Sequence, residues 1–534
     1  MWRKLLETIQ TTILGGAVLV GVTGILSKLF GLIRQRLIAS TFGAEGADPI
    51  YAAFAIPDFI YGTLILGSLL TSFMPVFIAY RQRDQAEAWR ISRSILNILM
   101  IVFFSLGLIL LVAAEPLVKL LVGHKFGLAA QHTAIVLTRI MSMNMLLFSI
   151  SNVFAGVLHS FRHFVAVSLA PIFNNLGIIA GLLWFVPVLG PAGVAWGAVG
   201  GAFLHTTIHA AAAWRVGWRP GRGAGWRHPG VRQIGQLLVP RTVGQSVTQL
   251  NQLATIPIAT RLGPANLSIF RWANDIQDFP VTIMGLSMAT VAFPRFVELL
   301  SQGRREEFVQ QFSTIVRNIL FVIIPVTVLF LQLRAQFVRV IIGAGQVSWP
   351  ETIATAQTLG FFALSFFAQS LIPVLARSFY AMQDTKTPMR YTIAAVSIAI
   401  LGSVVLSPIM GVQGLALAYS VSSVLNAGLL ALTLHRRIGH LDDDRIIQSV
   451  IKILGVTILM ALTVQATKYF LVSFGLDLTR AVGVLAQAVV AGAVGLISYA
   501  IFASLFRLSE ASLLTSVWQQ LRDRVWRNGL TRSS

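Results

Sequence analysis

The stretch that decides the fold is Gly24–Pro75, GILSKLFGLIRQRLIASTFGAEGADPIYAAFAIPDFIYGTLILGSLLTSFMP, in which two long apolar runs are joined by a short turn rich in Gly and Ala. Lys28 lies within the first run and Arg34 lies toward its end. Asp48 is in the turn, and Asp58 is inside the second run. A cation within a membrane-spanning segment is costly unless it faces a partner or water. Lys28 and Arg34 therefore predict the lining of a polar cavity.

The composition is that of a membrane protein. Of the 534 residues, 55% are hydrophobic and 11% are charged, and the mean hydropathy is +0.76. Apolar runs of roughly 20 residues, long enough to cross a bilayer, recur from end to end. The sequence therefore predicts an all-α polytopic membrane protein. It has no Cys, which excludes disulfides and thiolate metal sites.

The net charge of +21 also fits a membrane protein. The Arg residues lie in short loops between apolar runs, where they set topology, so we do not expect binding of nucleic acid. The N-terminus precedes an apolar run without a convincing cleavage site, and we interpret that run as a retained first span.

Hydropathy indicates about fourteen membrane-spanning helices. Connections after even-numbered spans, and the C-terminal tail, carry most of the Arg residues. By the positive-inside rule both termini are therefore cytoplasmic, which agrees with an even number of spans. The predicted spans cover residues 11–36, 50–80, 94–114, 132–158, 165–187, 191–213, 234–260, 268–298, 313–331, 352–379, 389–408, 412–434, 447–469 and 480–505.

A segment rich in Gly, Pro, Trp and Arg, WRVGWRPGRGAGWRHPGVRQ at 214–233, marks an internal boundary. Trp and Arg suit the headgroup region, so we interpret it as a basic interfacial linker. For its central part a merely solvated loop is an equal alternative. The predicted domains are an N-terminal six-helix bundle at 1–213, the linker at 214–233, a C-terminal six-helix bundle at 234–437, and 438–534 with two additional spans and a basic cytoplasmic tail.

The two halves resemble each other. Gly190-Pro-Ala-Gly-Val-Ala is similar to Gly411-Val-Gln-Gly-Leu-Ala, and Ile56-Pro-Asp-Phe is similar to Ile276-Gln-Asp-Phe, both at offsets of about 220 residues. Because each half holds six spans, both halves start on the same side. The pattern predicts a parallel repeat related by an axis along the membrane normal, with the substrate site between the halves.

The motifs of ATP hydrolysis, zinc proteolysis and serine hydrolysis (GxxxxGK[ST], HExxH and GxSxG) are absent, so we predict no catalytic residue, metal or cofactor. His205 and His209 are spaced to share a helical face as metal ligands, but an interfacial His pair is favoured because no third ligand is near. Asp275 and Asp278 are paired carboxylates suited to acid–base chemistry. Arg271, one turn before Asp275, favours a neutralised polar stripe on a cavity wall instead.

A family resemblance rests on several stretches. Ser27-Lys-Leu-Phe-Gly-Leu-Ile-Arg-Gln, Phe42-Gly, Ala47-Asp and Ala53-Phe-Ala-Ile-Pro-Asp resemble the opening of the MurJ (MviN) lipid II flippases, which carry S-R-x-x-G-x-x-R-D, F-G, D-A-F and A-F-x-x-P-N there. Two further stretches look like family motifs, and the resemblance covers nearly the whole chain. They are Ser378-Phe-Tyr-Ala-Met-Gln-Asp-Thr-Lys-Thr-Pro-Met and Leu158-His-Ser-Phe-Arg-His-Phe…Ala170-Pro…Asn174-Asn.

The resemblance implies a MOP-superfamily (MATE-like) fold, with two six-helix bundles forming a V plus two extra helices. It implies alternating-access transport of lipid II, the undecaprenyl-linked peptidoglycan precursor, from the cytoplasmic to the outer leaflet of the bacterial inner membrane during cell wall biogenesis. The family's cavity cations map to Lys28 and Arg34. The chain departs from the family pattern at Tyr61, at Leu66-Gly-Ser and at Asp275, which stand where the family has Arg, Glu-Gly-Ala and Arg. The acids that bind sodium in some members are also missing.

A pyrophosphate cannot cross hydrocarbon unpaired, and cavity cations offset its desolvation through charge-assisted hydrogen bonds. Arg271 stands one turn from the missing family Arg and is a candidate replacement, held by Asp275 and Asp278; alternatively it anchors the helix at the headgroups beside Trp272. The predicted substrate-binding residues are Ser27, Lys28, Arg34, Asp48, Asp58, Arg271, Asp275 and Asp278.

Three alternative functions stay open. One is a flippase for another polyprenyl-linked glycan, or a MATE-like antiporter. Another is a membrane enzyme acting on polyprenyl phosphates, for which Asp384 and Asp442-Asp-Asp444 are the cytoplasmic acids. The third is a scaffold without transport. The expected partners are the lipid-linked precursor, membrane lipids and the cell-wall synthesis machinery.

Overall fold

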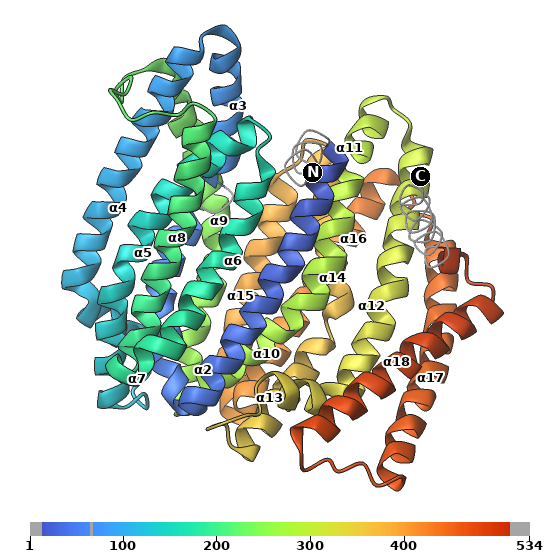
Figure 1. The fold of residues 1–534 in the computed structure, drawn as a ribbon. Helices are drawn as coiled ribbons and strands as arrows, with labels where there is room; N and C mark the ends of the chain where they lie inside the picture. Colours follow the sequence, from blue (N-terminus) through green and yellow to red (C-terminus); the bar gives the residue numbers. More distant parts are fainter. Residues whose placement is uncertain (1–12, 65–67, 513–534) are drawn as a thin grey trace, which may run out of the picture. The chain divides into compact units, whose positions relative to one another are not determined.

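The computed structural model describes residues 13–64 and 68–512, and helices account for most of them (Figure 1). Contacts divide the chain into two compact units. The first runs up to Arg271 and also includes Ile341–Glu351; the second comprises Trp272–Val340 and the chain from Thr352 onward. The boundary falls inside one helix, α10 (Asn266–Val281).

Besides the start of α10 and the segment Ile341–Glu351, the described part of the first unit contains eight α-helices and one π-helical segment. These are α2 (Ile13–Leu64), α3 (Ser68–Arg83), α4 (Gln85–Leu121), α5 (Leu128–Ser160), α6 (Phe164–Ala180), the π-helical η1 (Gly181–Phe185), α7 (Val186–Leu189), α8 (Ala192–Arg215) and α9 (Pro229–Leu262).

Helix α2 folds back on itself at Gly43, whose backbone is non-helical (φ 66°, ψ −174°). The Tyr51 hydroxyl donates to Gln35 Oε1 at 2.6 Å, although a straight helix would separate these residues by about 24 Å. The backbone N–H of Gln346 donates to the Ser40 carbonyl at 3.0 Å and braces the bend from outside. The two apolar runs are thus joined by a tight turn, as the sequence predicts.

Glycines bring α6 and α8 into backbone contact. A Cβ added at Gly197 would lie 2.6 Å from the Cα of Gly181, and one added at Gly177 would lie 2.2 Å from the Cα of Gly201. These residues are spaced four apart on each helix, so that they line one face. Small residues at this spacing let membrane helices approach closely. We call this contact the glycine seam.

The chain between α8 and α9 docks on α4. Trp218 is buried and its Nε1 donates to Ser92 Oγ at 3.1 Å, and the N–H of Gly225 donates to Ser94 Oγ at 3.0 Å. The central part of the predicted linker is therefore held by the protein. Helix α9 packs on α2, α3 and α4, so the contact boundary lies later in the chain than the predicted linker. The division into two six-helix bundles stays a prediction.

The second unit continues from α10. Its elements are the π-helical η2 (Thr282–Leu286), α11 (Ser287–Ser301), α12 (Arg305–Ile341), α13 (Trp349–Ala363), α14 (Phe366–Ala381), α15 (Lys386–Met410), α16 (Val412–Ile438), α17 (Asp443–Ser473), α18 (Ala481–Leu505) and the 3₁₀ turn η3 (Ser509–Ala511).

The two similar Gly motifs form the same turn, one in each unit. Gly190 between α7 and α8 has φ 59° and ψ −144°, and Gly411 between α15 and α16 has φ 64° and ψ −143°. Three residues later, a Cβ on Gly193 would meet Val186 N at 2.4 Å, and one on Gly414 would meet the Leu406 carbonyl oxygen at 2.6 Å. Both positions in each motif require glycine, which explains the shared sequence pattern.

Within the described residues, ten helices are long and apolar enough to cross a membrane, or eleven if the bent pair α13–α14 counts as one span. The predicted count of fourteen is not confirmed. The first two predicted spans fall in one continuous candidate, Gly21–Arg83. Helices α8 and α9, two further predicted spans, are not among the candidates, because His and Thr in α8 and Gln, Thr and Arg in α9 lower their hydropathy. Residues 11–12 of the first predicted span, and the Arg-rich tail, lie outside the described residues.

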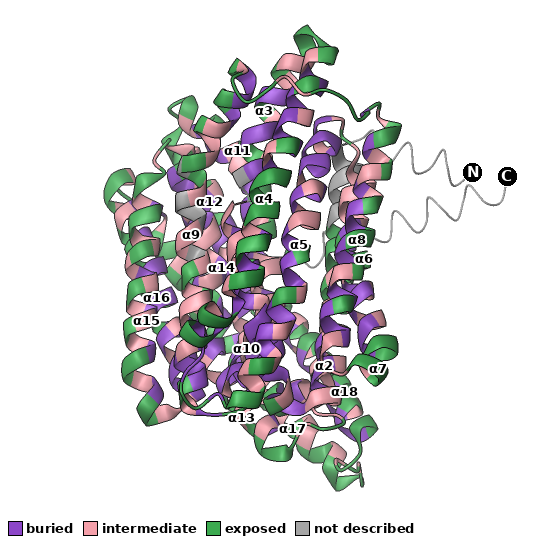
Figure 2. Cartoon of the chain, turned by 90° about the vertical axis from the view of Figure 1, so that its left-hand side faces the viewer, coloured by how far each residue is buried: buried purple, intermediate pink, exposed green. Residues whose placement is uncertain are grey.

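Large apolar side chains lie on the surface of α4, where Figure 2 shows many exposed positions. Ile101, Phe104 and Val112 are among them. Water-soluble proteins rarely expose such a continuous apolar surface. This face is suited to lipid, in agreement with a multi-pass membrane protein.

Candidate functional site

Three of the predicted cavity residues, all charged and all in the first unit, interact electrostatically. Asp58 is exposed, whereas Arg34 and Arg271 are half-buried. Both arginines interact electrostatically with the Asp58 carboxylate. The Asp58 carboxylate thus lies within electrostatic range of both guanidiniums. We call Arg34, Asp58 and Arg271 the arginine–aspartate cluster.

The bend in α2 makes this cluster possible. Arg34 and Asp58 both belong to α2, and in a straight helix they would stand about 36 Å apart. Reversal at Gly43 brings them within electrostatic range. The sequence predicts each residue as a ligand-binding group but does not predict that the two arginines face the same carboxylate.

Arg34 is oriented by a neighbouring helix. Its Nη1 donates to Asn175 Oδ1 at 3.0 Å. The Asn175 Nδ2 donates in turn to the Ser27 carbonyl at 3.2 Å and to the Pro171 carbonyl at 3.2 Å, and lies 3.4 Å from Ser27 Oγ. Asn175 therefore ties α6 to α2 and fixes the Arg34 side chain. Sequence reasoning missed this role, although the pair Asn174-Asn175 inside an apolar span was a signal.

Asp48 differs from its predicted role. It is 2% exposed, and its Oδ1 accepts hydrogen bonds from the Ser268 N–H at 2.8 Å and the Ser268 hydroxyl at 2.6 Å. A carboxylate at the first turn of a helix caps free N–H groups and complements the helix dipole. Asp48 thus holds the start of α10, the helix that carries Arg271. In this structure it positions a cation instead of lying open to a ligand.

The remaining predicted residues are placed as follows. Lys28 is exposed on α2, and Asp275 and Asp278 are half-buried on α10. The Thr282 hydroxyl donates to Asp278 Oδ1 at 2.8 Å. Trp272 is fully buried, so Trp272 does not supply the predicted headgroup anchor beside Arg271. A shared ion pair of Arg271 with Asp275 and Asp278 stays a prediction.

Tyr61, which stands where the family has an Arg, packs within the first unit. Its hydroxyl accepts from Asn152 Nδ2 at 2.7 Å, and its ring lies 5.1 Å from the Phe148 ring. A neutral hydrogen-bonded group has thus replaced a cation. The other departure, at Leu66 and Gly67, lies outside the described residues.

The His pair on α8 is buried between helices, and its place at the membrane interface stays a prediction. His205 and His209 are 9% and 2% exposed. Both Nδ1 atoms lie 2.7 Å from Ser151 Oγ on α5. His209 Nδ1 also lies 3.1 Å from the Ser151 carbonyl oxygen, which only accepts, so His209 carries its proton on Nδ1. The Ser151 hydroxyl then donates to His205. Both Nδ1 atoms are thus used in holding α5 against α8.

The arginine–aspartate cluster has the chemistry of an anion site. Arg presents several N–H donors in a planar fork that matches phosphate oxygens. The cluster lies on helices of a protein whose surface faces hydrocarbon, where an unpaired charge is costly. An anionic headgroup entering the cluster would relieve that cost.

Comparison with known proteins agrees with this chemistry. The family model described as "Lipid II flippase MurJ" matches residues 38–477. The chain belongs to the lipid II flippase MurJ family. A probable lipid II flippase MurJ of Rhizobium tropici is 29% identical over 436 residues, 79% of this chain and 80% of the relative. The lipid II flippase MurJ of Burkholderia cenocepacia is 26% identical over 77% of this chain and 82% of its own.

Solved structures show the same fold. A lipid II flippase MurJ in an inward closed conformation aligns with a TM-score of 0.77 at 19% identity, covering 92% of this chain and 98% of its own. An inward-facing multidrug resistance MATE transporter of the MOP superfamily aligns with a TM-score of 0.69 at 14% identity, covering 78% and 96%. The chain is therefore a multi-pass membrane protein with the MurJ and MATE fold.

Proposed function

We propose that this chain moves lipid II from the cytoplasmic to the outer leaflet of a bacterial inner membrane by alternating access, as part of peptidoglycan synthesis. Membership of the MurJ family supports this function, and the arginine–aspartate cluster is the observation that carries it. Lipid II has a pyrophosphate that needs a cationic partner inside the membrane. Enzymes of cell wall synthesis, which use lipid II at the outer face, are the protein partners that this function implies.

In this proposal Arg34 and Arg271 bind the pyrophosphate and Asp58 competes with it. While substrate is absent, the carboxylate neutralises part of the charge of the two arginines. When a pyrophosphate arrives, its oxygens replace the carboxylate as the guanidinium partners. Asn175 and Asp48 keep the two arginines in place and do not touch the substrate.

The test is a flipping assay with the full chain in liposomes and a fluorescent lipid II analogue. Loss of a charge-assisted hydrogen bond costs about 1.5–3 kcal/mol, so Arg34→Ala and Arg271→Ala should each slow transport roughly 10- to 100-fold. Arg93→Ala is the matched control, because Arg93 lies in the same unit and donates to the Arg219 carbonyl at 2.7 Å. Transport at the wild-type rate in both cluster variants contradicts the proposal.

Asp58→Asn sharpens this test. Removing the competing carboxylate should tighten binding of inorganic pyrophosphate to the purified protein, measured by calorimetry. A structural ion pair without a ligand role predicts the opposite: lower thermal stability and no gain in affinity. A parallel flipping assay with a different polyprenyl-linked glycan separates lipid II transport from the broader alternative.

We also propose cytoplasmic termini and a cytoplasmic 214–233 segment, from the Arg distribution. Because the chain has no Cys, single cysteines report topology. Trp226→Cys should resist an impermeant thiol reagent in intact cells, whereas Leu128→Cys, at the first residue of α5, should react. Both native side chains are exposed. Reversed labelling of the two sites would refute this topology.

A further inference from the structure

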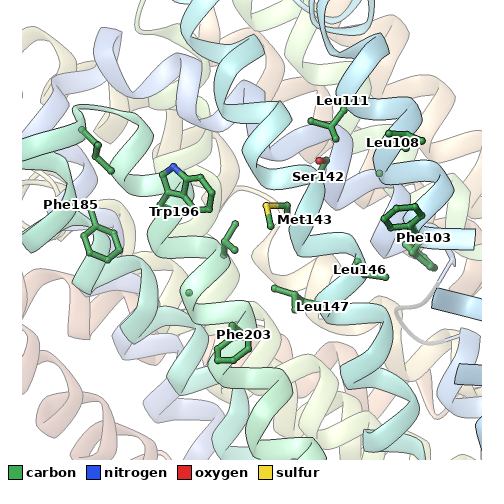
Figure 3. Close-up of a pocket in the computed structure, with 15 residues that line it drawn as sticks. Phe103, Leu108, Leu111, Ser142, Met143, Leu146, Leu147, Phe185, Trp196 and Phe203 are labelled. Atoms are coloured by element: carbon green, nitrogen blue, oxygen red, sulfur yellow. The ribbon is translucent and has the colours of Figure 1, made fainter. Parts of the chain in front are cut away.

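An apolar groove of about 730 Å³ lies on the first unit. Helix α5 forms its floor, with α4 on one side and α8 on the other, and both pack on α5. Figure 3 shows Leu108 of α4 and Trp196 and Phe203 of α8 on opposite sides, with Met143 of α5 between them. The groove belongs to one unit and is separate from the arginine–aspartate cluster.

Two glycines keep the groove open. A Cβ built on Gly200 of α8 would meet no atom within 4 Å, and one built on Gly107 of α4 would meet only the Ser142 carbonyl oxygen at 3.5 Å. A larger side chain would fit at either position and would fill the groove. The missing side chains therefore leave a channel that something else in the membrane must occupy.

A cation lies at one end of the groove. Arg139 is exposed on α5, one turn before Met143, and its Nε donates to the Leu111 carbonyl at 3.2 Å. Leu111 itself lines the groove. Arg139 falls inside a predicted span, at 132–158, and sequence reasoning did not single it out. An exposed Arg on such a helix needs an anionic or hydrogen-bonding partner.

The chain provides little to neutralise Arg139. The sequence has no Asp or Glu between Glu115 and Asp275. Glu115 reaches Arg139 electrostatically, but it accepts a hydrogen bond from Lys119 at 2.7 Å. Among the described residues, the hydrogen bond given for Arg139 goes to a backbone carbonyl, not to a carboxylate. Its other guanidinium N–H groups are available to an external anion.

Aromatic residues place the Arg139 end at the membrane surface. Trp196 is 41% exposed and Trp184 is 70% exposed, and exposed Trp marks the headgroup level of membrane proteins. From Trp196 to Phe203 on α8, and from Leu111 to Phe103 on α4, the groove extends about 10–12 Å along the helices. One leaflet contributes about 15 Å of hydrocarbon. The groove thus matches a lipid acyl chain in length.

We propose that this groove is a binding site for one anionic phospholipid, with the phosphate on Arg139 and an acyl chain between Gly107 and Gly200. Charge complementarity selects this occupant. A hydrophobic helix of another protein would fill the apolar part but leave Arg139 without an anion. A zwitterionic lipid brings an ammonium group that competes with the guanidinium for its own phosphate.

The test is native mass spectrometry of the full chain, purified in detergent and incubated with equal amounts of phosphatidylglycerol and phosphatidylcholine. The wild type should retain phosphatidylglycerol about tenfold better, the effect of one charge-assisted hydrogen bond. Arg139→Gln should remove this preference. Gly200→Leu should reduce retention of both lipids, and Gly107→Leu repeats that test from the opposite side. Gly455→Leu is the matched control, because Gly455 is an exposed glycine of α17 with open space around it.

The proposal is overturned if Arg139→Gln and the two groove-filling variants retain phosphatidylglycerol as the wild type does. That result would favour a hydrophobic helix of another protein as the occupant of the groove. It is also overturned if equimolar undecaprenyl phosphate displaces the phospholipid, since the occupant is then a polyprenyl chain. Size-exclusion profiles equal to that of the wild type show that each variant is folded.

Discussion

The hairpin of α6, η1, α7 and α8 in the first unit and the hairpin of α15 and α16 in the second close with the same turn. Beyond the turn they differ. In the first, Gly181 lies against Gly197 and the two backbones touch; in the second, Gly402 lies against Ala418, and a Cβ on Gly402 would meet the Ala418 methyl at 3.1 Å. A turn motif therefore fixes how two helices are joined, whereas the residues that follow fix how closely they approach.

The largest expected effect comes from adding a methyl group to the tighter hairpin. In Gly197→Ala the new Cβ would lie 2.6 Å from the Gly181 Cα and 2.9 Å from the Gly177 carbonyl oxygen, so the helices must separate. We expect a loss of roughly 3 kcal/mol, seen as a much lower Tm. Gly402→Ala should be near neutral, because helix propensity offsets a mild contact. Equal Tm values for the two variants would remove the distinction between the hairpins.

The next largest effect is expected at the glycine turn that the two hairpins share. Gly190 and Gly411 occupy a backbone region that is essentially restricted to Gly, and Ala there costs about 1–3 kcal/mol. Gly190→Ala and Gly411→Ala should therefore lower stability by similar amounts in thermal unfolding. Gly428→Ala, in the open part of α16, is the control and should not destabilise. A large difference between the two turn variants would show that the turns are not equivalent.

A smaller effect is expected from making the second hairpin resemble the first. Ala418→Gly removes the methyl group that separates α15 and α16, but the helices are already spaced for it. We expect a loss of about 1 kcal/mol from backbone entropy. If the variant is instead more stable than the wild type, the wider spacing is imposed from elsewhere in the unit.

The smallest effect concerns the open end of the second hairpin, where Asp384 lies 2.6 Å from Arg437. Partial burial raises the pKa of Asp384, but hydrogen bonds from Thr387 and Arg437 outweigh it and lower the pKa to about 2. The pKa of Asp384 is therefore lower in the folded protein than in the unfolded chain, where it is about 4. The ionised carboxylate stabilises the fold fully above about pH 4, and this stabilisation is lost as the pH falls toward 2.

Asp384→Asn keeps an acceptor for the first N–H groups of α15 and removes the ion pair, so it should cost less than about 1 kcal/mol. The difference in Tm from the wild type should be present at pH 6 and shrink between pH 4 and pH 2. Arg436→Gln, one residue before Arg437, is the control. If the difference in Tm between Asp384→Asn and the wild type does not change with pH, the ion pair does not contribute to stability.

Much of the fold follows from local patterns. Hydropathy predicts the membrane-spanning helices, and the two similar Gly motifs predict two similar turns. The paired apolar runs of Gly24–Pro75 predict the bend of α2. The count of spans does not follow, because α8 and α9 carry polar residues. In α8, the histidines and glycines are used against other helices of the protein.

The candidate site is predictable as a set of residues but not as an arrangement. Charge within apolar runs identifies Arg34, Asp58 and Arg271. Asp48, in the turn between two such runs, was predicted with them, but in the structure it caps α10. Whether a carboxylate binds a ligand, a helix end or a guanidinium depends on residues far away in sequence, such as Ser268. Hydropathy and spacing contain no information on those partners.

The glycine seam has a mechanical consequence. Side chains between helices can change rotamer and let the helices slide, but backbones in direct contact have no such freedom. Helices α6 and α8 must therefore move together as one rigid body. The backbone turns at both ends of this pair, where Arg162 before α6 and Gly217 after α8 have positive φ angles of 58° and 103°. Any rocking of this hairpin during a transport cycle would therefore move α6 and α8 as one body and leave the seam unchanged.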